Sequence, residues 1–409
     1  MPRAAFAGVT AKLRPHVALP LVATNRINMP EVAEAILAAG DADMVSMARP
    51  LLADPQWVAK ARAGRRDDIN TCIACNQACL DHVFVGKRAS CLVNPRACAE
   101  TELVYAPTPA PRRVVVVGAG PAGLACATVA AGRGHRVTLV DAAAEIGGQF
   151  NLAKRIPGKE EFHETLRYFD RQLAASGVER RLGRRIDAQA LLEGGWDEIV
   201  LATGIVPRAV AFPGADHPKV VSYLDVLTGR VVPGARVAII GAGGIGFDVA
   251  EFLVAPPPSP TLDVARWMEE WGVAADFEGP GGLEPPEPEP PAREVWLLQR
   301  SPGKPGARLG KTTGWIHRAA LKAKGVQALG GVEYLGVADD GLRIRVGGEE
   351  RLLPVDHVVV CAGQEPLRAL VEPLRAAGRT PHLIGGADVA NELDAKRAID
   401  QGSRLAAAL

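Results

Sequence analysis

Apolar and polar positions alternate along this chain in blocks that predict strands followed by helices. In the first 71 residues we predict a buried parallel strand for ALPLVATNRI at 18–27 and a helix for MPEVAEAILAAG at 29–40. A second strand is predicted within ADMVSMARPLL at 42–52, ending in a turn at Arg49 and Pro50. Residues 1–71 are therefore expected to form alternating α/β structure.

Two proline-bearing segments interrupt this pattern. A polar linker, TELVYAPTPAPRR at 101–113, marks a domain boundary ahead of a long α/β region. Within that region, residues 255–292 hold ten of the chain's 32 prolines. Proline cannot occupy the interior of a helix or sheet without cost, so this composition predicts a surface insertion. One helix is expected between its proline runs, with Trp267 and Trp271 on one face as a packing contact.

A complete strand–helix–strand unit has the sequence RVVVVGAGPAGLACATVAAGRGHRVTLVD. In its G-x-G-x-x-G motif, Gly118 makes the turn, Gly120 admits a pyrophosphate and Gly123 lets helix and strand approach. The phosphates then meet the N-terminus of the helix. Asp141 ends the second strand and can bond a ribose hydroxyl. The unit predicts a dinucleotide site, and the glycine turn EIGGQ at 145–149 suits a flavin.

A second unit, RVAIIGAGGIGFDVAEFL, repeats the glycine spacing at Gly241, Gly243 and Gly246. The next strand, EVWLLQ, ends in Arg300 where NAD-binding proteins carry an acid. A cation there favours the 2′-phosphate of NADP, although a solvated loop arginine would look the same. Ser301 adds a hydroxyl but no second charge. This unit predicts an NAD(P)H site with a preference for NADPH.

Two further strands that end in glycine, at 198–204 and 357–363, frame this second unit. The chain therefore leaves the first domain, builds a second and returns. The returning segment contains a GGAD turn at Gly386 and Asp388 that could hold a ribityl or phosphate group. A helix from about Asp394 would point its N-terminus at a flavin.

Four cysteines upstream of both units, Cys72, Cys75, Cys79 and Cys91, have the spacing C-x2-C-x3-C-x11-C. Three thiolates within eight residues face one point only if the backbone curls around it, and the distal cysteine closes a four-sulfur cage. Iron–sulfur clusters need this arrangement. Structural zinc also accepts four thiolates but more often uses two C-x2-C pairs. A cluster is favoured, and zinc or a disulfide framework stay as alternatives.

The bulk composition bounds the function without defining it. A chain of 409 residues, 48% hydrophobic, suggests two or three domains with sizeable cores. The formal net charge of +1 implies no nucleic acid or membrane surface as partner. With seven cysteines, no signal peptide and no apolar run of 18 residues, the expected setting is the cytoplasm, with no membrane span.

These motifs resemble known families at two levels. VVVVGAGPAGL and the ATG and GGAD turns resemble the two-dinucleotide-domain flavoproteins built like disulfide reductases. The first helix has only Cys126 and no C-x4-C, so dithiol chemistry is not expected and Cys126 is assigned to packing. The whole chain resembles the bacterial NADPH-dependent 2,4-dienoyl-CoA reductases, relatives of trimethylamine dehydrogenase. The most specific stretches are CIACNQACLDHVFVGKRASCLVNPRAC, EIGGQFNLAKRIPGKEEF, VVSYLDVL, GKTTGWIHR and CAGQEP.

Members of that family join an FMN-bearing TIM barrel of old-yellow-enzyme type, a 4Fe–4S cluster, an FAD domain and an NADPH domain. The fold class implied here is α/β: a C-terminal remnant of the barrel, the cluster segment, and two nested Rossmann-like domains. The implied domains are residues 1–71 (barrel remnant), 72–107 (cluster segment and linker), 108–230 and 356–409 (FAD), and 231–355 (NADPH, with the insertion 255–292).

The resemblance also implies cofactor positions. The four cysteines would ligate the cluster, leaving Cys98 spare. FMN phosphate would lie at Arg26, Ala48 and Arg49, and NADPH at Gly241, Gly243, Gly246, Arg300 and Ser301. Where the family commonly has a second basic residue, this chain has Ser301. FAD would contact Gly118, Gly120, Ala122, Gly123, Asp141, Gly148, Gln149, Val206, Gly386, Asp388, Asp394, Ala395 and Lys396.

The barrel that the family uses for its final step is only partly represented. A (β/α)8 barrel needs about 250 residues, whereas 71 precede the cysteines, enough for about two βα units. The family's proton donors are a tyrosine and a histidine of the barrel. All four tyrosines here (Tyr105, Tyr168, Tyr223 and Tyr334) follow the cysteines, and His16 matches no catalytic position. No catalytic residue is therefore assigned.

The expected electron path runs from NADPH to FAD, then to the cluster and FMN. One hypothesis is a 2,4-dienoyl-CoA reductase acting on unsaturated acyl-CoA in fatty-acid β-oxidation, with the rest of the barrel missing or supplied by a partner chain. A second is a stand-alone NADPH:acceptor oxidoreductase that serves a separate electron acceptor. A third is an inactive fragment that binds nucleotides without turnover.

Overall fold

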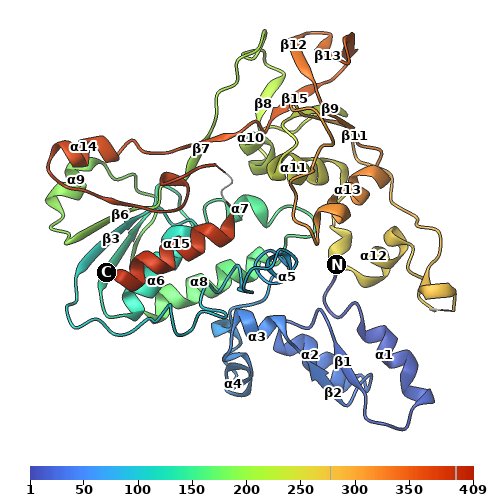
Figure 1. Ribbon diagram of the computed structural model, residues 1–409, viewed down its shortest axis with the longest axis horizontal. Coiled ribbons are helices and arrows are strands. Elements are labelled where there is room, and N and C mark those ends of the chain that lie inside the picture. The colour runs from blue at the N-terminus through green and yellow to red at the C-terminus, as the bar shows by residue number, and fades with distance from the viewer. Residues whose placement is uncertain (277, 392–393) are drawn as a thin grey trace. The chain divides into compact units, whose positions relative to one another are not determined.

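The computed structural model of the protein describes residues 1–276, 278–391 and 394–409. Phe277 of the predicted insertion and Glu392 and Leu393 of the returning segment lie outside the described residues. The chain divides into two compact units, coloured along the sequence in Figure 1. The first unit comprises Met1–Met47, Leu152–Glu160 and Pro207–Gly363, and the second comprises Ala48–Asn151, Glu161–Val206 and Gln364–Leu409.

The second unit is built on a five-stranded parallel sheet with the order β17-β6-β3-β4-β5. Its central strand β3 contains four consecutive valines, all buried, because neighbouring elements cover both faces. This strand order is that of a doubly wound dinucleotide-binding fold. The bounds are β3 Arg113–Val117, β4 Arg136–Val140, β5 Glu179–Arg181, β6 Glu198–Leu201 and β17 His382–Leu383.

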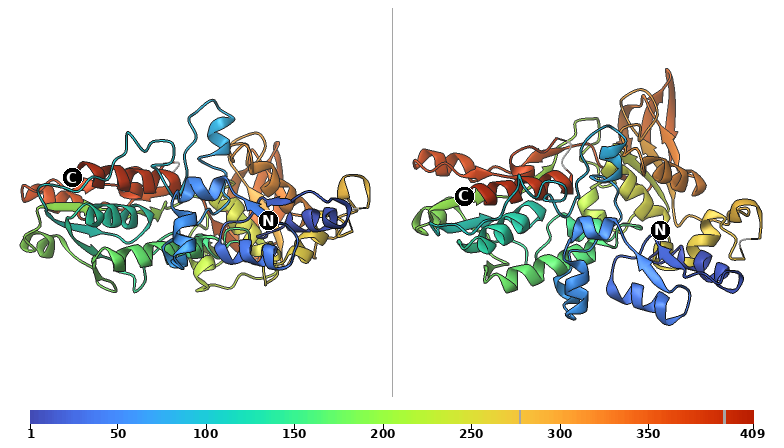
Figure 2. Two further views of the ribbon diagram at one scale, coloured as in Figure 1. Left: turned by 90° about the horizontal axis from the view of Figure 1, so that it is seen from below. Right: turned by 60° about the horizontal axis from the view of Figure 1, so that its bottom comes forward.

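Two long helices that are far apart in the sequence, α6 (Pro121–Gly132) and α15 (Ala395–Ala408), pack closely against each other in this unit (Figures 1 and 2). Their contact is lined by small residues, and the backbone oxygen of Ala122 lies where a Cβ on Gly402 would stand. The predicted helix start is confirmed, since the carboxylate of Asp394 accepts the backbone N–H of Arg397 at 2.7 Å.

The remaining elements of the second unit surround this core. They are the helices α3 Arg49–Ala53, α4 Trp57–Arg62, α5 Leu80–Val83, α8 Phe162–Ala175, α9 Ala188–Glu193 and α14 Val371–Ala376, the 3-10 turns η2 Arg66–Asp68 and η5 Gly385–Ala387, and strand β16 Gln364–Pro366. The chain passes from one unit to the other within helix α7 (Phe150–Ala153) and within strand β7 (Ile205–Pro207). Strand β7 pairs with β16.

The first unit repeats the architecture with a parallel sheet in the order β11-β10-β9-β15-β8. A three-stranded antiparallel sheet, β12-β13-β14, packs its apolar side chains into the same core as β9 and β10. The strands are β8 Val220–Ser222, β9 Arg236–Ile240, β10 Glu294–Leu298, β11 Gln327–Leu329, β12 Glu333–Ala338, β13 Gly341–Val346, β14 Glu349–Leu353 and β15 His357–Val360. The helices are α10 Tyr223–Thr228, α11 Gly244–Val254 and α13 Gly314–Ala323.

The insertion at 255–292 carries the predicted helix, α12 (Val264–Trp271), between the turns η3 Pro260–Leu262 and η4 Pro280–Gly282. The rings of Trp267 and Trp271 stack on each other with centroids 6.3 Å apart. Both tryptophans stay partly exposed, and no residue of α12 is fully buried. The expectation of a surface insertion is therefore confirmed.

The first 47 residues form a small α/β element: α1 (Ala7–Leu13), η1 (Arg14–His16), α2 (Pro30–Ala38) and the parallel pair β1 (Val22–Thr24) and β2 (Met44–Ser46). The predicted helix at 29–40 is confirmed. The strand at 18–27 is shorter than expected and only partly buried, since Ala23 is 1% exposed but Val22 is 46% exposed. Each strand has one hydrogen-bonded partner among the described residues, so each has one unpaired edge.

The turn predicted at Arg49 and Pro50 is instead the first turn of α3. Proline is tolerated at the start of a helix, where its missing N–H would be unpaired anyway, so it opens this helix. Residues 48–71 lie in the second unit, with the cysteine segment, and not with residues 1–47. The domain boundaries themselves stay predictions.

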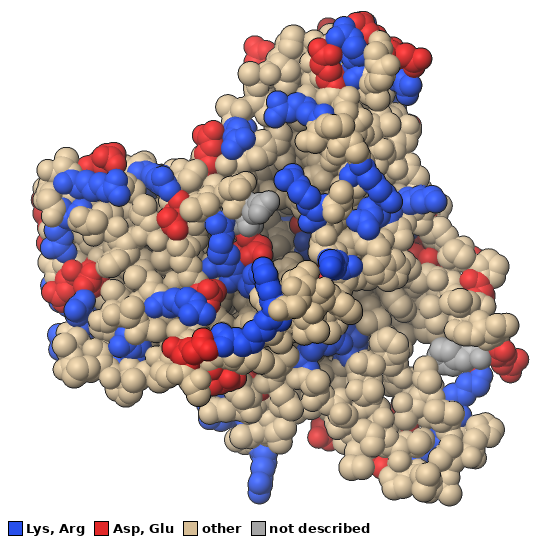
Figure 3. Space-filling view, in the orientation of Figure 1, with Lys and Arg blue, Asp and Glu red and all other residues tan. Residues whose placement is uncertain are grey.

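Charged side chains of both signs are interspersed over the face shown in Figure 3, in keeping with the net charge of +1. Among the described residues, no helix has the length and apolar character that crossing a bilayer requires.

Replacing Gly402 by Ala should destabilise the second unit, although alanine usually favours a helix. The added Cβ would meet the Ala122 oxygen at 2.2 Å, and overpacking of this kind costs about 1–3 kcal/mol. Gly132→Ala in the partner helix is the matched control. No atom lies within 4 Å of its added Cβ, so it should gain up to about 1 kcal/mol. Thermal or urea unfolding measures both, and equal effects would contradict the packing described.

Candidate functional site

The first glycine loop lies between β3 and α6 and is closed tightly around its own backbone. Gly118 has φ +113°, and a Cβ there would stand 2.2 Å from the Ala202 oxygen. A Cβ on Gly123 would stand 1.8 Å from the Gly118 oxygen. Gly148 of the EIGGQ turn, with φ +51°, lies against Gly120. The loop therefore needs glycine for its own geometry, before any ligand is considered.

Asp141, at the end of β4, is tied to this loop. One carboxylate oxygen accepts the backbone N–H of Ala119 at 2.6 Å and the other accepts that of Ala143 at 2.7 Å. The predicted ribose ligand thus also holds the glycine turn in shape. Ala122 lies in the first turn of α6 beside the loop, while Gln149 is exposed next to Gly148.

The returning segment brings the predicted flavin residues of the C-terminal region together. The Gln401 amide donates to the Asp388 carboxylate at 2.6 Å and accepts the Gly385 N–H at 2.7 Å, which fixes the GGAD turn. Gly386 is buried in that turn, and Ala395 opens α15. Lys396 donates to the Nε2 atom of His82 at 3.2 Å. Val206, on β7, is 38% exposed.

The second glycine loop, between β9 and α11, has the same geometry in the first unit. Gly241 has φ +111°, and a Cβ on Gly246 would stand 1.8 Å from the Gly241 oxygen. Gly243 differs, because no atom lies within 4 Å of the Cβ it would carry. The space above Gly243 is therefore open, as the approach of a pyrophosphate requires.

Arg300 and Ser301 follow β10 and are both exposed. Burial raises the pKa of Tyr334 on β12 to about 12. The guanidinium of Arg300 lies nearby, and its positive charge partly opposes this rise. An exposed cation at the end of this strand suits a phosphate ligand.

Two charged pairs on α11 were not anticipated from the sequence. Lys159 donates to Asp248 at 2.6 Å, and His317 of α13 contacts Glu251 at 2.6 Å. Burial raises the pKa of Glu251. For His317, burial favours the neutral ring, but the bond with Glu251 outweighs it and raises the pKa. The three-residue spacing of Asp248 and Glu251 on one helix face was the available signal, but their partners are distant in sequence.

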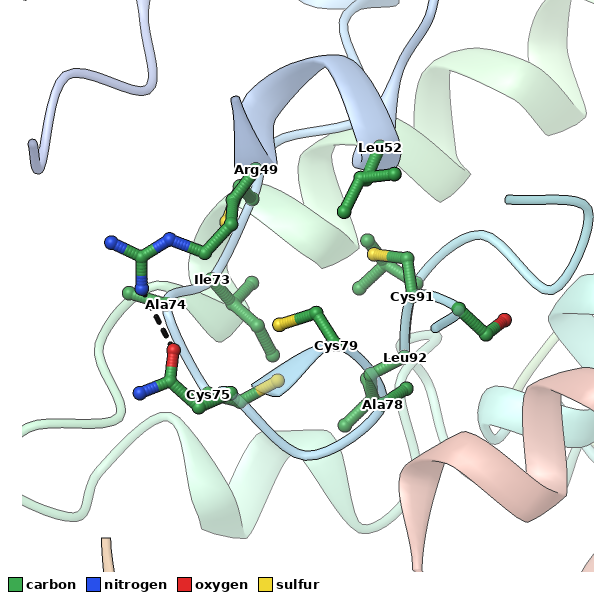
Figure 4. Close-up of a pocket in the computed structure, with 13 residues that line it drawn as sticks. Arg49, Leu52, Ile73, Ala74, Cys75, Ala78, Cys79, Cys91 and Leu92 are labelled. Atoms are coloured by element: carbon green, nitrogen blue, oxygen red, sulfur yellow. Dashed lines mark hydrogen bonds between the residues drawn. The ribbon is translucent and has the colours of Figure 1, made fainter. Parts of the chain in front are cut away.

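The four cysteines line one cavity of the second unit (Figure 4). Its space, including the part open to solvent, is about 330 Å³. Ala74 and Asn76, with φ of 55° and 59°, are left-handed and curl the loop between the first three cysteines. The N–H of Ser90 donates to the Ala78 oxygen at 2.7 Å, which brings the distal cysteine beside this loop. The remaining lining residues are Arg49, Leu52, Ile73, Leu92 and Val93.

The thiols in this cavity are poorly solvated. Burial raises the pKa of Cys75 to about 12, an effect opposed by the backbone N–H of Gln77 and reinforced by Cys72 and Cys79. Burial and the neighbouring thiols likewise raise the pKa of Cys91, against backbone N–H groups of residues 93 and 94. Thiolates here need a positive group between them, and amides already point at the sulfurs. This donor set fits an iron–sulfur cluster.

In the described part of the chain, no three His, Cys, Asp or Glu side chains are arranged to hold a single metal ion. Cys75, Cys79 and Cys91 form no disulfide in the structure. The preference for a cluster over zinc stays a prediction from the cysteine spacing.

The three positions assigned to FMN lie in different units. Arg26, in the first unit, donates to the backbone oxygens of Met1 and Pro2 at 3.1 and 3.3 Å. Ala48 and Arg49 lie in the second unit, and the Arg49 guanidinium donates to the side chain of Asn76 at 2.7 Å. The FMN assignment stays a prediction.

Two nested dinucleotide-binding folds define a class of flavin- and pyridine nucleotide-dependent oxidoreductases. The profile of the pyridine nucleotide-disulphide oxidoreductase family matches residues 112–383, about two thirds of the chain, and the chain belongs to this family. The profile of the NADH:flavin oxidoreductase / NADH oxidase family matches residues 3–68. The predicted α/β fold class, the flavin and NAD(P)H domains and the oxidoreductase class are thereby confirmed.

The chain is similar to several characterised proteins. It is 35% identical over 393 residues to a metal reductase of Desulforamulus reducens, covering 95% of this chain and 58% of the relative. It is 29% identical to a bilirubin reductase of Mediterraneibacter gnavus, covering 96% and 56%. A solved complex of 2-naphthoyl-CoA reductase superposes with a TM-score of 0.87 at 27% identity, covering all of this chain and 57% of that one. The chain thus spans less than three fifths of these relatives.

Replacing Gly243 by Ala should strongly weaken NAD(P)H binding without unfolding the first unit. The protein leaves the space free, but the pyrophosphate approaches there. We expect an unchanged melting temperature and flavin content, with at least a tenfold weaker response to NADPH in a flavin-bleaching titration. Gly244→Ala is the control, because it also meets no atom and the first loop carries Pro121 at the corresponding place. Loss of binding in both variants would argue against this placement of the nucleotide.

Proposed function

We propose that this chain is the electron-input part of an iron–sulfur flavoprotein reductase, taking electrons from NADPH through FAD to a 4Fe–4S cluster. The observation that carries the proposal is the cavity lined by Cys72, Cys75, Cys79 and Cys91 in the same compact unit as the first dinucleotide fold. When bound, FAD would take a hydride from NADPH and release single electrons that the cluster can carry.

The chain's own residues would hold these groups without acid–base catalysis. The first glycine loop, with Asp141 and Asp388, would bind FAD through its phosphates and hydroxyls. The open space at Gly243 and the exposed Arg300 would admit NADPH. The buried thiols and the amides that point at them would hold the cluster and exclude water. Hydride transfer between stacked rings requires no proton donor, which agrees with the absence of an assigned one.

For the final step we propose an unsaturated acyl-CoA of the 2,4-dienoyl type, reduced at FMN in a barrel to which residues 1–71 contribute. The resemblance in the cysteine segment supports this, as does the likeness to a solved 2-naphthoyl-CoA reductase complex. Arg26, Ala48 and Arg49 would then hold the FMN phosphate. A cytoplasmic setting, where thiols stay reduced, is part of this proposal.

A second candidate is transfer to a separate electron acceptor outside any barrel. The similarity to a metal reductase over 95% of this chain favours it. Both candidates share the input path through FAD and the cysteines, and they differ only in where the electrons leave.

Anaerobic purification with analysis of iron, sulfide and flavin tests the input path. We expect about four iron atoms and one FAD per chain, with the flavin bleached by NADPH. Cys91→Ser should lose most of the iron yet keep FAD, because the serine hydroxyl is a poor ligand at neutral pH. Cys98→Ser is the control, since Cys98 is exposed and does not line the cavity. Zinc in place of iron, or an equal iron content in both variants, would contradict the proposal.

Replacing Arg300 by Ala should weaken NADPH selectively. Loss of a charged hydrogen bond to the 2′-phosphate, worth about 1.5–3 kcal/mol, corresponds to a rise in KM for NADPH of about 10- to 100-fold. The KM for NADH should change less than about twofold, because NADH has no such phosphate. Steady-state dye reduction with both nucleotides gives the ratio. Arg351→Ala, an exposed arginine of β14 paired with Glu349, controls for general charge. An equal rise in KM for NADPH and NADH would show that Arg300 does not bind the 2′-phosphate.

A further inference from the structure

Arg49 belongs to the wall of the cysteine cavity. It is the first residue of α3 and lines the cavity together with Leu52, one turn later on the same helix (Figure 4). Among the described residues that line the cavity, Arg49 alone carries a formal charge; the others are cysteine, apolar or neutral polar.

The arginine is held in this position by the cysteine loop itself. Its guanidinium donates to the Oδ1 atom of Asn76 at 2.7 Å, shown by the dashed line in Figure 4. Asn76 directly follows Cys75 and has φ 59°, a conformation that asparagine tolerates better than most side chains. The contact is partly buried, so solvent screens the charge less than at an open surface.

A charge in this place would change the reduction potential of a cluster bound in the cavity. A cluster held by four thiolates is anionic and becomes more negative on reduction, and its potential depends on nearby charge, hydrogen bonds and exposure. A fixed cation therefore stabilises the reduced form more than the oxidised form. In a medium of low effective dielectric constant, this preference reaches beyond direct contact.

We propose that Arg49 is a positioning residue for electron transfer: anchored by Asn76, it raises the reduction potential of the cluster held by the four cysteines. The inference rests on the proposed function, since it concerns the same cavity. It gives Arg49 this role on the contacts seen here, in addition to the contact with the FMN phosphate proposed above.

The test is a redox titration of the intact, cluster-containing chain, followed by electron paramagnetic resonance of the reduced cluster. Arg49→Gln should make the cluster about tenfold harder to reduce, a downward shift of about 59 mV for one electron. Arg49→Lys keeps the charge and should recover most of the potential. Asn76→Gly removes the anchor while tolerating the left-handed conformation, and should lower the potential by a smaller amount.

Arg88→Gln is the matched control. Arg88 lies on the same cysteine segment but is exposed, pairs with Glu102 and does not line the cavity. Its loss should leave the potential unchanged. An equal shift in Arg88→Gln, or none in Arg49→Gln with the cluster intact, overturns the inference.

Failure of the proposed function looks different from failure of this inference. If the unaltered chain holds no iron and gives no cluster signal, the proposed function fails. If the cluster is present and Arg49→Gln changes only the FMN content, the arginine serves the flavin phosphate and the inference alone fails.

Discussion

The cysteine segment and the first dinucleotide-binding fold share one hydrophobic core, and the rest of the candidate electron path depends on this. Leu92, Val93 and Ala53 are buried in the same cluster as the apolar residues of β3, α6 and α15, and the cysteines Cys72, Cys75 and Cys91 pack against it. Electron transfer between two bound groups needs a fixed separation. A common core supplies that separation in a way that a flexible linker between two independent domains could not.

Polar contacts hold residues 54–71, which precede Cys72, against this core. Arg167 of α8 donates to the backbone oxygen of Ile69 at 2.9 Å and to the Thr71 hydroxyl at 3.0 Å. The buried Asp54 carboxylate accepts from Lys60 at 2.6 Å and from the Asn70 N–H at 2.9 Å. Because an ion pair of this kind is expensive to break once buried, residues 54–71 are bound to the unit that holds the cysteines. That explains why the compact unit begins at residue 48.

The first unit shows how a second nucleotide fold is nested without disturbing the first. Its sheet repeats the order of four strands, with β11, β10, β9 and β15 corresponding to β5, β4, β3 and β6. Its glycine loop repeats the same close approach of backbone to backbone. Lys159, from the segment Leu152–Glu160, pairs with Asp248 of α11. His317 of α13 pairs with Glu251 of the same helix. The acidic residues of α11 are thus partnered, and the loop at Gly243 is left open.

The sequence by itself determined the features that rest on local geometry. The glycine spacings predicted both loops, because a Cβ at Gly123 or Gly246 would collide with backbone whatever else the fold contains. The valine run of β3 and the cap at Asp394 were likewise readable, since burial pattern and capping act over a few residues. The cysteine spacing predicted that all four thiols surround one point, and in the structure all four line one cavity.

Only the tertiary structure decided the features that depend on residues far apart in sequence. It placed Arg49 on the cysteine loop through Asn76, 27 positions later, and paired Glu251 with His317, 66 positions later. It also left Val22 of β1 exposed where the apolar pattern predicted a buried strand, because a pattern shows which side chains favour a core but not what packs against them. Such pairings follow from how sheets and helices pack, and no local spacing encodes them.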